Sequence, residues 1–390
     1  MTHSPAAGAP VITSDEPGSF AWTVLAKRHP ALIQQVRDAV PYPPQQQRAL
    51  DALLAETAHG VIEPLPAEAH DHARWAAWSA QYVGRSWFEV PFLWAESYFY
   101  RKLLEAVRYF EPGPWQGIDP FASFKRAELR DATVEEELAA LDDLSKLPPE
   151  AQDQALLTGA LWGNRADLGF RISSADPTDL GRHLIADDSD QLWSHLADSP
   201  SPTVYLLADN AGRELIPDLI LIDHLLHTGR ADQAVLHVKP YPYYVSDATT
   251  TDVIDCVHRI SESPGQAGLI GPSLFDALSN GRLSVRSHPF SCAPLPYADM
   301  PDDLRTDLAR ATVTISKGDL NYRRLVGDRL RPATTPFADP TSYFPSPLLA
   351  LRTLKSDIAI GLEPSTLAAL EATGAPWRTS GTHAVIQFRP

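Results

Sequence analysis

The sequence predicts an α/β protein, a three-layer αβα sandwich with a mainly parallel sheet, preceded by an all-helical N-terminal domain. From about residue 190, short β-like runs alternate with helix-length segments, as they do in a parallel sheet that helices cover on both faces. From residue 20 to about residue 161, the apolar residues recur with helical spacing. We therefore expect a flexible tail over residues 1–18, a helical domain over 19–170 and an α/β domain over 171–390.

The N-terminal half contains several helical segments. The first 18 residues are rich in Pro, Ala, Ser and Gly, which is typical of a loose tail. Helical spacing then predicts helices over residues 25–40, 44–58, from 68 onward, 92–104 and 135–147. The segment 92–104 is apolar on nearly all sides and is expected to be buried, although it carries Glu96 and Arg101. Because a buried charge is costly unless it is paired, these two residues indicate either a structural ion pair or the lining of a site.

The second half begins with a short run of β-formers at Thr203, which predicts a buried strand. The run stops at Asp209-Asn210, and Ala211-Gly212 then allows a tight turn into a helix that continues to residue 226. Further β-like runs lie at 234–238, 283–286, 311–316, 348–354 and 383–388, and a helix is expected over 250–260.

Composition excludes several classes of function. A formal net charge of −16 argues against a nucleic acid or an anionic membrane as the main partner. The two cysteines form no ligand-spaced set, and we find neither a signal peptide nor a membrane-spanning stretch, so a cytoplasmic protein is expected. There is no GxxxxGK[ST] loop and no GxGxxG after a strand, which disfavours P-loop and dinucleotide folds.

Three β-like runs each deliver an aspartate just past their end: Asp209, Asp247 and Asp319. A single such aspartate is usually a helix cap. In a parallel sheet, however, the carboxyl ends of the strands meet at one edge, so three of them beside Asn210 favour a shared site. Carboxylate and amide oxygens without His or Cys are suited to Mg²⁺ or Mn²⁺.

Basic residues accompany these acids. They lie on the same kind of strand-end loop: Lys317, Arg323, Arg352 and Lys355. Each alone is commonly a solvated surface charge, but together with a cation they form the arrangement that binds a phosphoryl group. The stretch before Asn210 lacks the second aspartate of an Asp-x-Asp phospho-aspartate enzyme, so the sequence favours direct attack by metal-activated water. Asn164 and Asp167 lie in a polar cluster that either caps turns or faces the site.

The motifs resemble those of the damage-control phosphatases, in the branch marked by Arg-Thr-x-Lys. This motif is present as Arg352-Thr353-Leu354-Lys355. Matching signatures stand in order as Trp162-Gly-Asn-Arg-Ala-Asp-Leu168, Asp209-Asn-Ala-Gly-Arg-Glu214, Lys239-Pro-Tyr-Pro, Val245-Ser-Asp247 and Lys317-Gly-Asp-Leu-Asn-Tyr-Arg323. The segment Phe92-Leu-Trp-Ala-Glu-Ser-Tyr-Phe-Tyr-Arg101 is also similar to the helical region of the family.

The resemblance implies a phosphatase for sugar phosphates such as fructose 1-phosphate or fructose 6-phosphate, dependent on Mg²⁺, Mn²⁺, Co²⁺ or Ni²⁺. By this resemblance the metal ligands are Asp209, Asn210 and Asp247. The substrate residues it implies are Glu214, Asp319, Asn321, Tyr322, Arg323 and Lys355, with Asn164, Asp167 and Arg352 also facing the site. Among all these residues, we expect Asp209, Asp247, Asp319 and Lys355 to take part in catalysis.

Two alternatives remain open at the level of sequence. One is an S-adenosylmethionine-dependent methyltransferase acting on protein glutamates, an activity also attached to this family, although no Gly-rich turn follows the first strand. The other is a sugar-phosphate-binding protein without catalysis, which the intact set of acids disfavours. The sequence does not fix the physiological substrate, the preferred metal or the oligomeric state.

Overall fold

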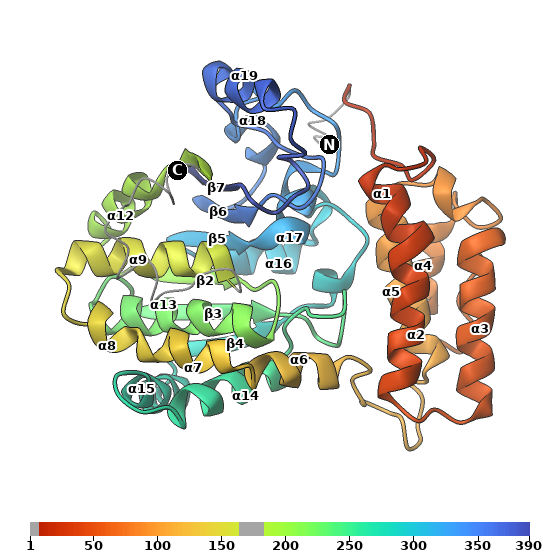
Figure 1. Ribbon diagram of the computed structural model, residues 1–390, viewed down its shortest axis with the longest axis horizontal. Helices are drawn as coiled ribbons and strands as arrows, with labels where there is room; N and C mark the ends of the chain where they lie inside the picture. The colour runs from red at the N-terminus through yellow and green to blue at the C-terminus, as the bar shows by residue number, and fades with distance from the viewer. Residues whose placement is uncertain (1–7, 164–182) are drawn as a thin grey trace.

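The computed structural model describes residues 8–163 and 183–390. It has a helical part beside a larger α/β part (Figure 1). The helical part consists of α1 (Phe20–Thr23), α2 (His29–Ala39), α3 (Pro44–His59), α4 (His72–Ser79) and α5 (Phe92–Ala106). A π-helical segment over residues 24–28 joins α1 to α2, so residues 20–39 form one continuous helical stretch.

The α5 helix is buried, as its sequence predicts. Arg101 is paired with Asp71 at 2.7 Å and with Glu105 at 2.7 Å, and it is therefore part of an ion pair inside the helical part. Glu96 instead faces the α/β part, where its Oε2 lies 2.8 Å from Arg323 Nη1. Glu96 and Arg101 thus have separate partners, one in each part of the molecule.

A seven-stranded sheet forms the centre of the α/β part, in the order β1-β7-β6-β5-β2-β3-β4. The strands are β1 (Leu184–Asp187), β2 (Thr203–Leu207), β3 (Gln233–Val238), β4 (Leu283–Ser287), β5 (Val313–Lys317), β6 (Leu348–Thr353) and β7 (Ala384–Arg389). All neighbouring strands run parallel except β6 and β7, which are antiparallel. The predicted mainly parallel sheet is confirmed.

Helices cover both faces of this sheet. Alternation along β2 sends Val204 and Leu206 to one face and Tyr205 and Leu207 to the other, where they join two different hydrophobic clusters. The first face packs against α12 (Ser189–Ala197), α13 (Leu215–His227), α14 (Thr250–Ser261) and α15 (Ala267–Asn280). The second packs against α16 (Asp302–Leu308), α17 (Gly318–Val326) and α19 (Pro364–Ala372), with the short α18 (Ala338–Thr341) beside α17. This is the three-layer arrangement that the sequence predicts.

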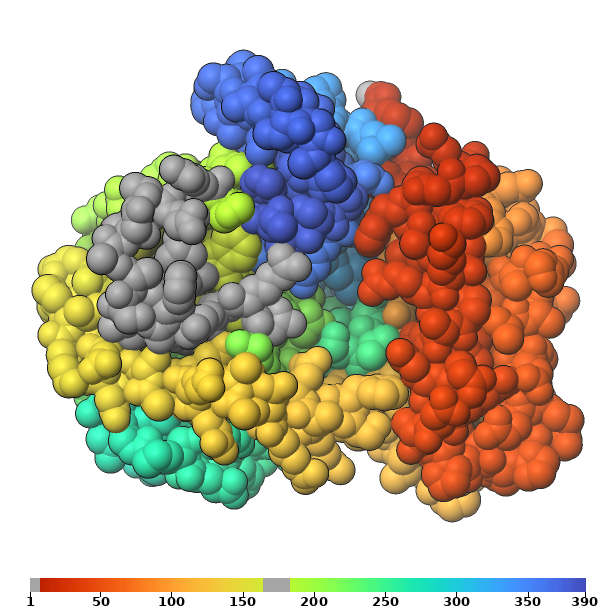
Figure 2. Space-filling view, viewed as in Figure 1, coloured from red at the N-terminus to blue at the C-terminus, as the bar shows by residue number. Residues whose placement is uncertain are grey.

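The boundary between the two parts lies earlier than residue 170, the position that the sequence suggested. The segment 122–162 forms α6 (Ala122–Leu129), α7 (Ala132–Ala139), α8 (Leu141–Leu144) and α9 (Pro149–Trp162). Leu129, Val134 and Leu157 belong to the same hydrophobic cluster as Val204 of β2. Figures 1 and 2 show this orange-to-yellow segment lying along the α/β part. Periodicity correctly indicated helices here, but it does not reveal which core a helix covers.

Residues 11–13, which the sequence predicts to be part of a flexible tail over residues 1–18, make specific contacts with the rest of the protein. Val11 forms a β-bridge with Arg329, and Phe92 N donates to the carbonyl of the buried Ile12 at 2.8 Å. These contacts fix residues 11–13 between the two parts of the molecule. Within residues 8–163 and 183–390, no helix combines the length and the apolar character needed to cross a bilayer.

Candidate active site

The carboxyl ends of three neighbouring strands, β5, β2 and β3, deliver the predicted acids to one edge of the sheet. Asp209 follows β2 and Asp319 lies in the first turn of α17 directly after β5. Asp247 ends the loop after β3, where it forms a β-bridge with Asn210. Ala248 N also donates to the carbonyl of Asp209 at 2.9 Å. Asp209, Asn210 and Asp247 therefore lie on adjoining backbone segments, as the sequence predicts.

The acids that follow β2 are crowded and buried. The amide nitrogen Nδ2 of Asn210 lies 3.2 Å from Asp209 Oδ2 and 3.0 Å from Glu214 Oε2. Burial, followed by the charges of Glu214 and Asp247, raises the pKa of Asp209 well above its ordinary value. This arrangement concentrates negative charge in a space with little water, and it is therefore suited to a cation.

Asp247 is also buried, with 2% of its surface exposed. Lys125 Nζ donates to its carbonyl at 3.0 Å, and Lys239 Nζ lies 3.4 Å from its Oδ2 as an ion pair. Within the described part of the chain, this Oδ2 has no partner with hydrogen-bond geometry. Burial raises the pKa of Asp247 to about 6, although Lys239 works in the opposite direction. A buried carboxylate oxygen without a hydrogen bond is suited to coordinating a cation.

Gly318 brings the start of α17 against the carboxylate of Asp209. Its φ is +87°, and a Cβ built on it would lie 1.9 Å from Asp209 Oδ2. Only glycine permits this approach, because it lacks the Cβ and adopts the left-handed conformation without strain. The amino end of α17 carries partial positive charge, which favours the ionised form of the neighbouring carboxylate.

The three predicted metal ligands fit a hard divalent cation. Among residues 8–163 and 183–390, no three His, Cys, Asp or Glu side chains are arranged to hold a metal ion. The predicted donor set differs in kind, since it combines two carboxylates with the amide oxygen of Asn210. That oxygen now accepts from Ser246 Oγ at 2.7 Å. Half a turn about the Cβ–Cγ bond of Asn210 presents the oxygen to Asp209, and the Ser246 hydroxyl can then accept from the amide nitrogen. The oxygen-only donor set matches Mg²⁺ or Mn²⁺ chemistry.

Asp319 and Arg352 are paired with each other. Arg352 Nη2 lies 2.7 Å from Asp319 Oδ1, which also accepts from Ser356 Oγ at 3.0 Å and from Lys355 N at 3.4 Å. The guanidinium of Arg352 covers the ring of Tyr322 at 4.3 Å. Burial opposes ionisation of Asp319, but the charges of Arg352 and Arg323 together with the hydrogen bonds from Arg352 and Ser356 outweigh it and lower the pKa of this carboxyl. The Arg-Thr-x-Lys motif is thereby held against the start of α17.

Other predicted substrate residues make contacts within the protein. Arg323 is bound between Glu96 at 2.8 Å and Asp328 at 2.7 Å, so its charge is matched by two carboxylates. Asn321 Nδ2 donates to the carbonyl of Ala208 at 3.1 Å, next to Asp209. The remaining contacts are Tyr322 OH to Gln387 Oε1 at 2.7 Å and Lys317 Nζ to Asp218 Oδ1 at 2.6 Å. These side chains hold the sheet edge together, and a role in substrate binding stays a prediction for them.

Glu214 and Lys355 are coupled through charge. Burial opposes ionisation of Glu214, but the charges of Lys355 and Lys317 together with the hydrogen bonds to its carboxylate outweigh burial and lower its pKa. The end of α9 approaches the same carboxylate, because a Cβ on Gly163, whose φ is +51°, would lie 2.5 Å from Glu214 Cγ. The predicted site residues that come next in the chain, Asn164 and Asp167, lie outside the described residues.

One residue near the site was not singled out by its sequence pattern. Lys125 of α6 is buried, and besides Asp247 it contacts Asp252 at 2.9 Å and Asp119 at 3.0 Å. In a helix that mixes polar and apolar residues, nothing in the sequence marks a lysine as part of a site. Lys125 reaches Asp247 because α6 packs against the α/β part.

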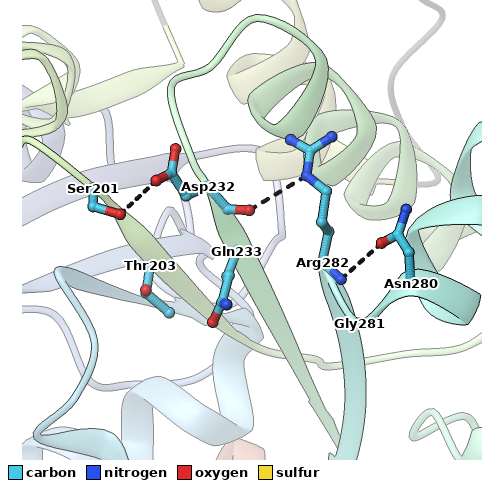
Figure 3. Close-up of a pocket in the computed structure, with 7 residues that line it drawn as sticks. All are labelled: Ser201, Thr203, Asp232, Gln233, Asn280, Gly281 and Arg282. Carbon is cyan, nitrogen blue, oxygen red and sulfur yellow. Dashed lines mark hydrogen bonds between the residues drawn. The ribbon is translucent and has the colours of Figure 1, made fainter.

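A separate polar hollow of about 470 Å³ lies at the opposite edge of the sheet (Figure 3). Its lining comes from the amino ends of β2, β3 and β4: Ser201, Thr203, Asp232, Gln233, Asn280, Gly281 and Arg282. Arg282 is held there, with its amide donating to Asn280 Oδ1 at 3.0 Å and its Nε to the carbonyl of Asp232 at 3.4 Å. Ligands of α/β sheets bind at the carboxyl ends of strands, so this hollow is not the predicted site.

Comparison with known proteins identifies the family of this chain. The family profile described as damage-control phosphatase ARMT1-like domain matches residues 24–369. The damage-control phosphatase ARMT1 of Mus musculus is 33% identical over 77% of this chain and 75% of its own length. Those of Danio rerio and Homo sapiens are 32% and 31% identical, over 78% and 77% of this chain and 74% and 75% of their own.

A crystal structure of a DUF89 family protein from Pyrococcus horikoshii aligns with 95% of this chain and 98% of its own, at a TM-score of 0.48 and 17% identity. The matched profile spans most of the chain, and the mouse relative is 33% identical over 77% of it. The chain belongs to the damage-control phosphatase ARMT1-like family.

Proposed function

We propose that this protein is a metal-dependent phosphatase that hydrolyses phosphorylated sugars of the fructose 1-phosphate or fructose 6-phosphate type. The observation that carries the proposal is the convergence of Asp209, Asn210 and Asp247 on one edge of the sheet, with lysines around them. Family membership supports a phosphatase acting on small phosphorylated metabolites. Mn²⁺, Mg²⁺, Co²⁺ or Ni²⁺ would be held by the two carboxylates and the Asn210 amide oxygen.

A cation bound there would offset the charge of the phosphate and lower the pKa of a coordinated water. The residues of the chain contribute binding and orientation. The positive charge of Lys355 favours the ionised forms of both Asp209 and Glu214. We therefore expect Lys355 to contribute to binding of the phosphate.

The carboxylates around this position have different tasks because they differ in charge. Glu214 and Asp319 have lowered pKa values and are ionised at neutral pH, so each can accept a hydrogen bond from the attacking water or a sugar hydroxyl. Arg352 fixes the orientation of Asp319 at 2.7 Å. Asp209 has a raised pKa and needs a nearby positive charge to remain ionised.

The test is a panel of phosphorylated sugars assayed for release of inorganic phosphate with each of the four cations. We expect release that chelation abolishes and Mn²⁺ restores, and no release by Asp209→Ala protein that retains a wild-type circular dichroism spectrum. Full activity in Asp209→Ala would refute the site. Transfer of label from S-adenosylmethionine to a glutamate-bearing acceptor after chelation, without phosphate release, would instead support the methyltransferase alternative.

A further inference from the structure

The turn that leads into Asp247 has an unfavourable backbone conformation. Tyr244 and Val245 have φ values of +47° and +66°, and neither is glycine. In this region the Cβ of an L-residue crowds the following carbonyl oxygen, and a β-branched side chain such as Val245 is a genuine outlier. Such a conformation persists only when the surroundings impose it, and it is found most often at functional sites.

The backbone of the turn is fixed against the segment that follows β2. Ala211 N donates to the carbonyl of Ser246 at 2.6 Å, and Ser246 Oγ donates to Asn210 Oδ1 at 2.7 Å. Within the turn, Asp247 N donates to the carbonyl of Tyr243 at 3.2 Å. The position of Asp247 beside Asn210 therefore depends directly on the path of the chain through Tyr244 and Val245.

The side chains of the turn are fixed against α5 of the helical part. Tyr244 OH and Ser97 Oγ are 2.9 Å apart, and the ring of Tyr100 stacks on that of Tyr244 at 4.7 Å between centroids and an interplanar angle of 26°. Tyr243 OH also donates to the carbonyl of Ser97 at 3.4 Å. Ser97 and Tyr100 are close together on α5, since they are three residues apart.

We propose that Ser97, Tyr100 and Tyr244 form a latch that holds this turn in its left-handed conformation and thereby positions Asp247 beside Asp209 and Asn210. The three are positioning residues, and the consequence for cation binding rests on the proposed function. Without the latch, Tyr244 and Val245 can relax to negative φ, which redirects the chain immediately before Asp247. The helical part is then a determinant of the geometry of the site.

The experiment compares Ser97→Ala and Tyr244→Phe with Tyr98→Phe. Tyr98 is on the same helix, and its hydroxyl donates to the carbonyl of Glu63 at 2.8 Å inside the helical part, so its variant loses a comparable hydrogen bond away from the turn. Native-state hydrogen exchange is followed at the amides of Ala211 and Ala248, which bond across the two segments. Mn²⁺ affinity is measured by calorimetry on the full chain without substrate.

Both latch variants should exchange at these two amides about fivefold faster than wild type and bind Mn²⁺ about fivefold more weakly, the effect of one hydrogen bond. Tyr98→Phe should leave both quantities unchanged, even if its melting temperature falls as much. The double variant should match the single ones, because they remove the same bond. Exchange at Ala211 and Ala248 that equals wild type in both latch variants would overturn the proposal. Absence of Mn²⁺ binding by wild type would refute the proposed function, while the exchange rates would still decide whether the latch exists.

Discussion

Replacing Gly318 by alanine should disable the site and also reduce stability, because it adds both backbone strain and a steric contact with Asp209. A Cβ at this position would lie 1.9 Å from Asp209 Oδ2 and 2.7 Å from Asp209 Cβ, whereas real Cβ atoms essentially never approach another heavy atom closer than 3.0 Å. The carboxylate or the start of α17 must therefore move by about 1 Å. A displacement of that size at a reacting centre can reduce the rate about 100-fold.

The same helix offers a matched control. Gly327 ends α17 with a φ of +90°, close to the +87° of Gly318, but an added Cβ would have no atom within 4 Å. Both alanine variants suffer the same left-handed strain of about 1–2 kcal/mol, partly offset by a less flexible unfolded chain. Only the Gly318 variant also disturbs Asp209. The comparison therefore separates backbone strain from displacement of the carboxylate.

The assay is kcat/KM for phosphate release, together with urea unfolding of each protein. We expect about a 100-fold loss for Gly318→Ala, equivalent to about 2.7 kcal/mol of transition-state stabilisation, and less than a twofold change for Gly327→Ala. The free energy of unfolding should fall by about 1 kcal/mol in Gly327→Ala. If Gly318→Ala keeps an activity within twofold of the Gly327 variant, Asp209 does not need its present position, and the reasoning fails.

Three further outcomes are expected. Burial lowers the pKa of His29 to about 3 in the folded protein, whereas in the unfolded chain it is about 6.5. The unfolded state therefore takes up a proton first, and the free energy of unfolding falls as the pH drops from 6.5 toward 3. Urea titrations should show that this free energy is about 2 kcal/mol lower at pH 5 than at pH 7, and that His29→Phe removes the difference. Arg323→Met leaves two buried carboxylates without their partner and should reduce the free energy of unfolding by about 3–5 kcal/mol, whereas an unchanged urea midpoint would show that the pair is not structural. Asp209→Asn removes one of several crowded charges, so its melting temperature by calorimetry should equal or exceed that of wild type, while phosphate release is lost.

The sequence contained enough information to locate the sheet and the acids at its edge. Strand runs bounded by turn residues predicted β2, β3 and β5, and the parallel arrangement then required Asp209, Asp247 and Asp319 to share one edge. That inference needs only the order of polar and apolar residues and the rule that parallel strands end together.

What sequence alone could not supply was the pairing of residues that are distant in the chain. Glu96 and Arg323 are 227 positions apart, and the sequence around either residue does not indicate that the other is its partner. The same holds for Lys125, whose contact with Asp247 exists because α6 packs on the α/β part. Helical periodicity shows which face of a helix is apolar, but that face could pack against any of several apolar surfaces in the molecule.

The crowding of acids at the sheet edge explains why such a site would select cations by charge. Asp209 and Asp247 are both buried with raised pKa values, and Glu214 is ionised beside them. Holding these carboxylates together costs stability in the absence of a cation, because burial and mutual repulsion both disfavour the charged forms. A divalent ion relieves both penalties at once, whereas a single ammonium group such as that of Lys239, 3.4 Å from Asp247, offsets only part of them. If the proposed function holds, a divalent ion would gain binding energy by relieving these penalties, and lysines such as Lys239 would lower the total negative charge that a phosphorylated anion meets.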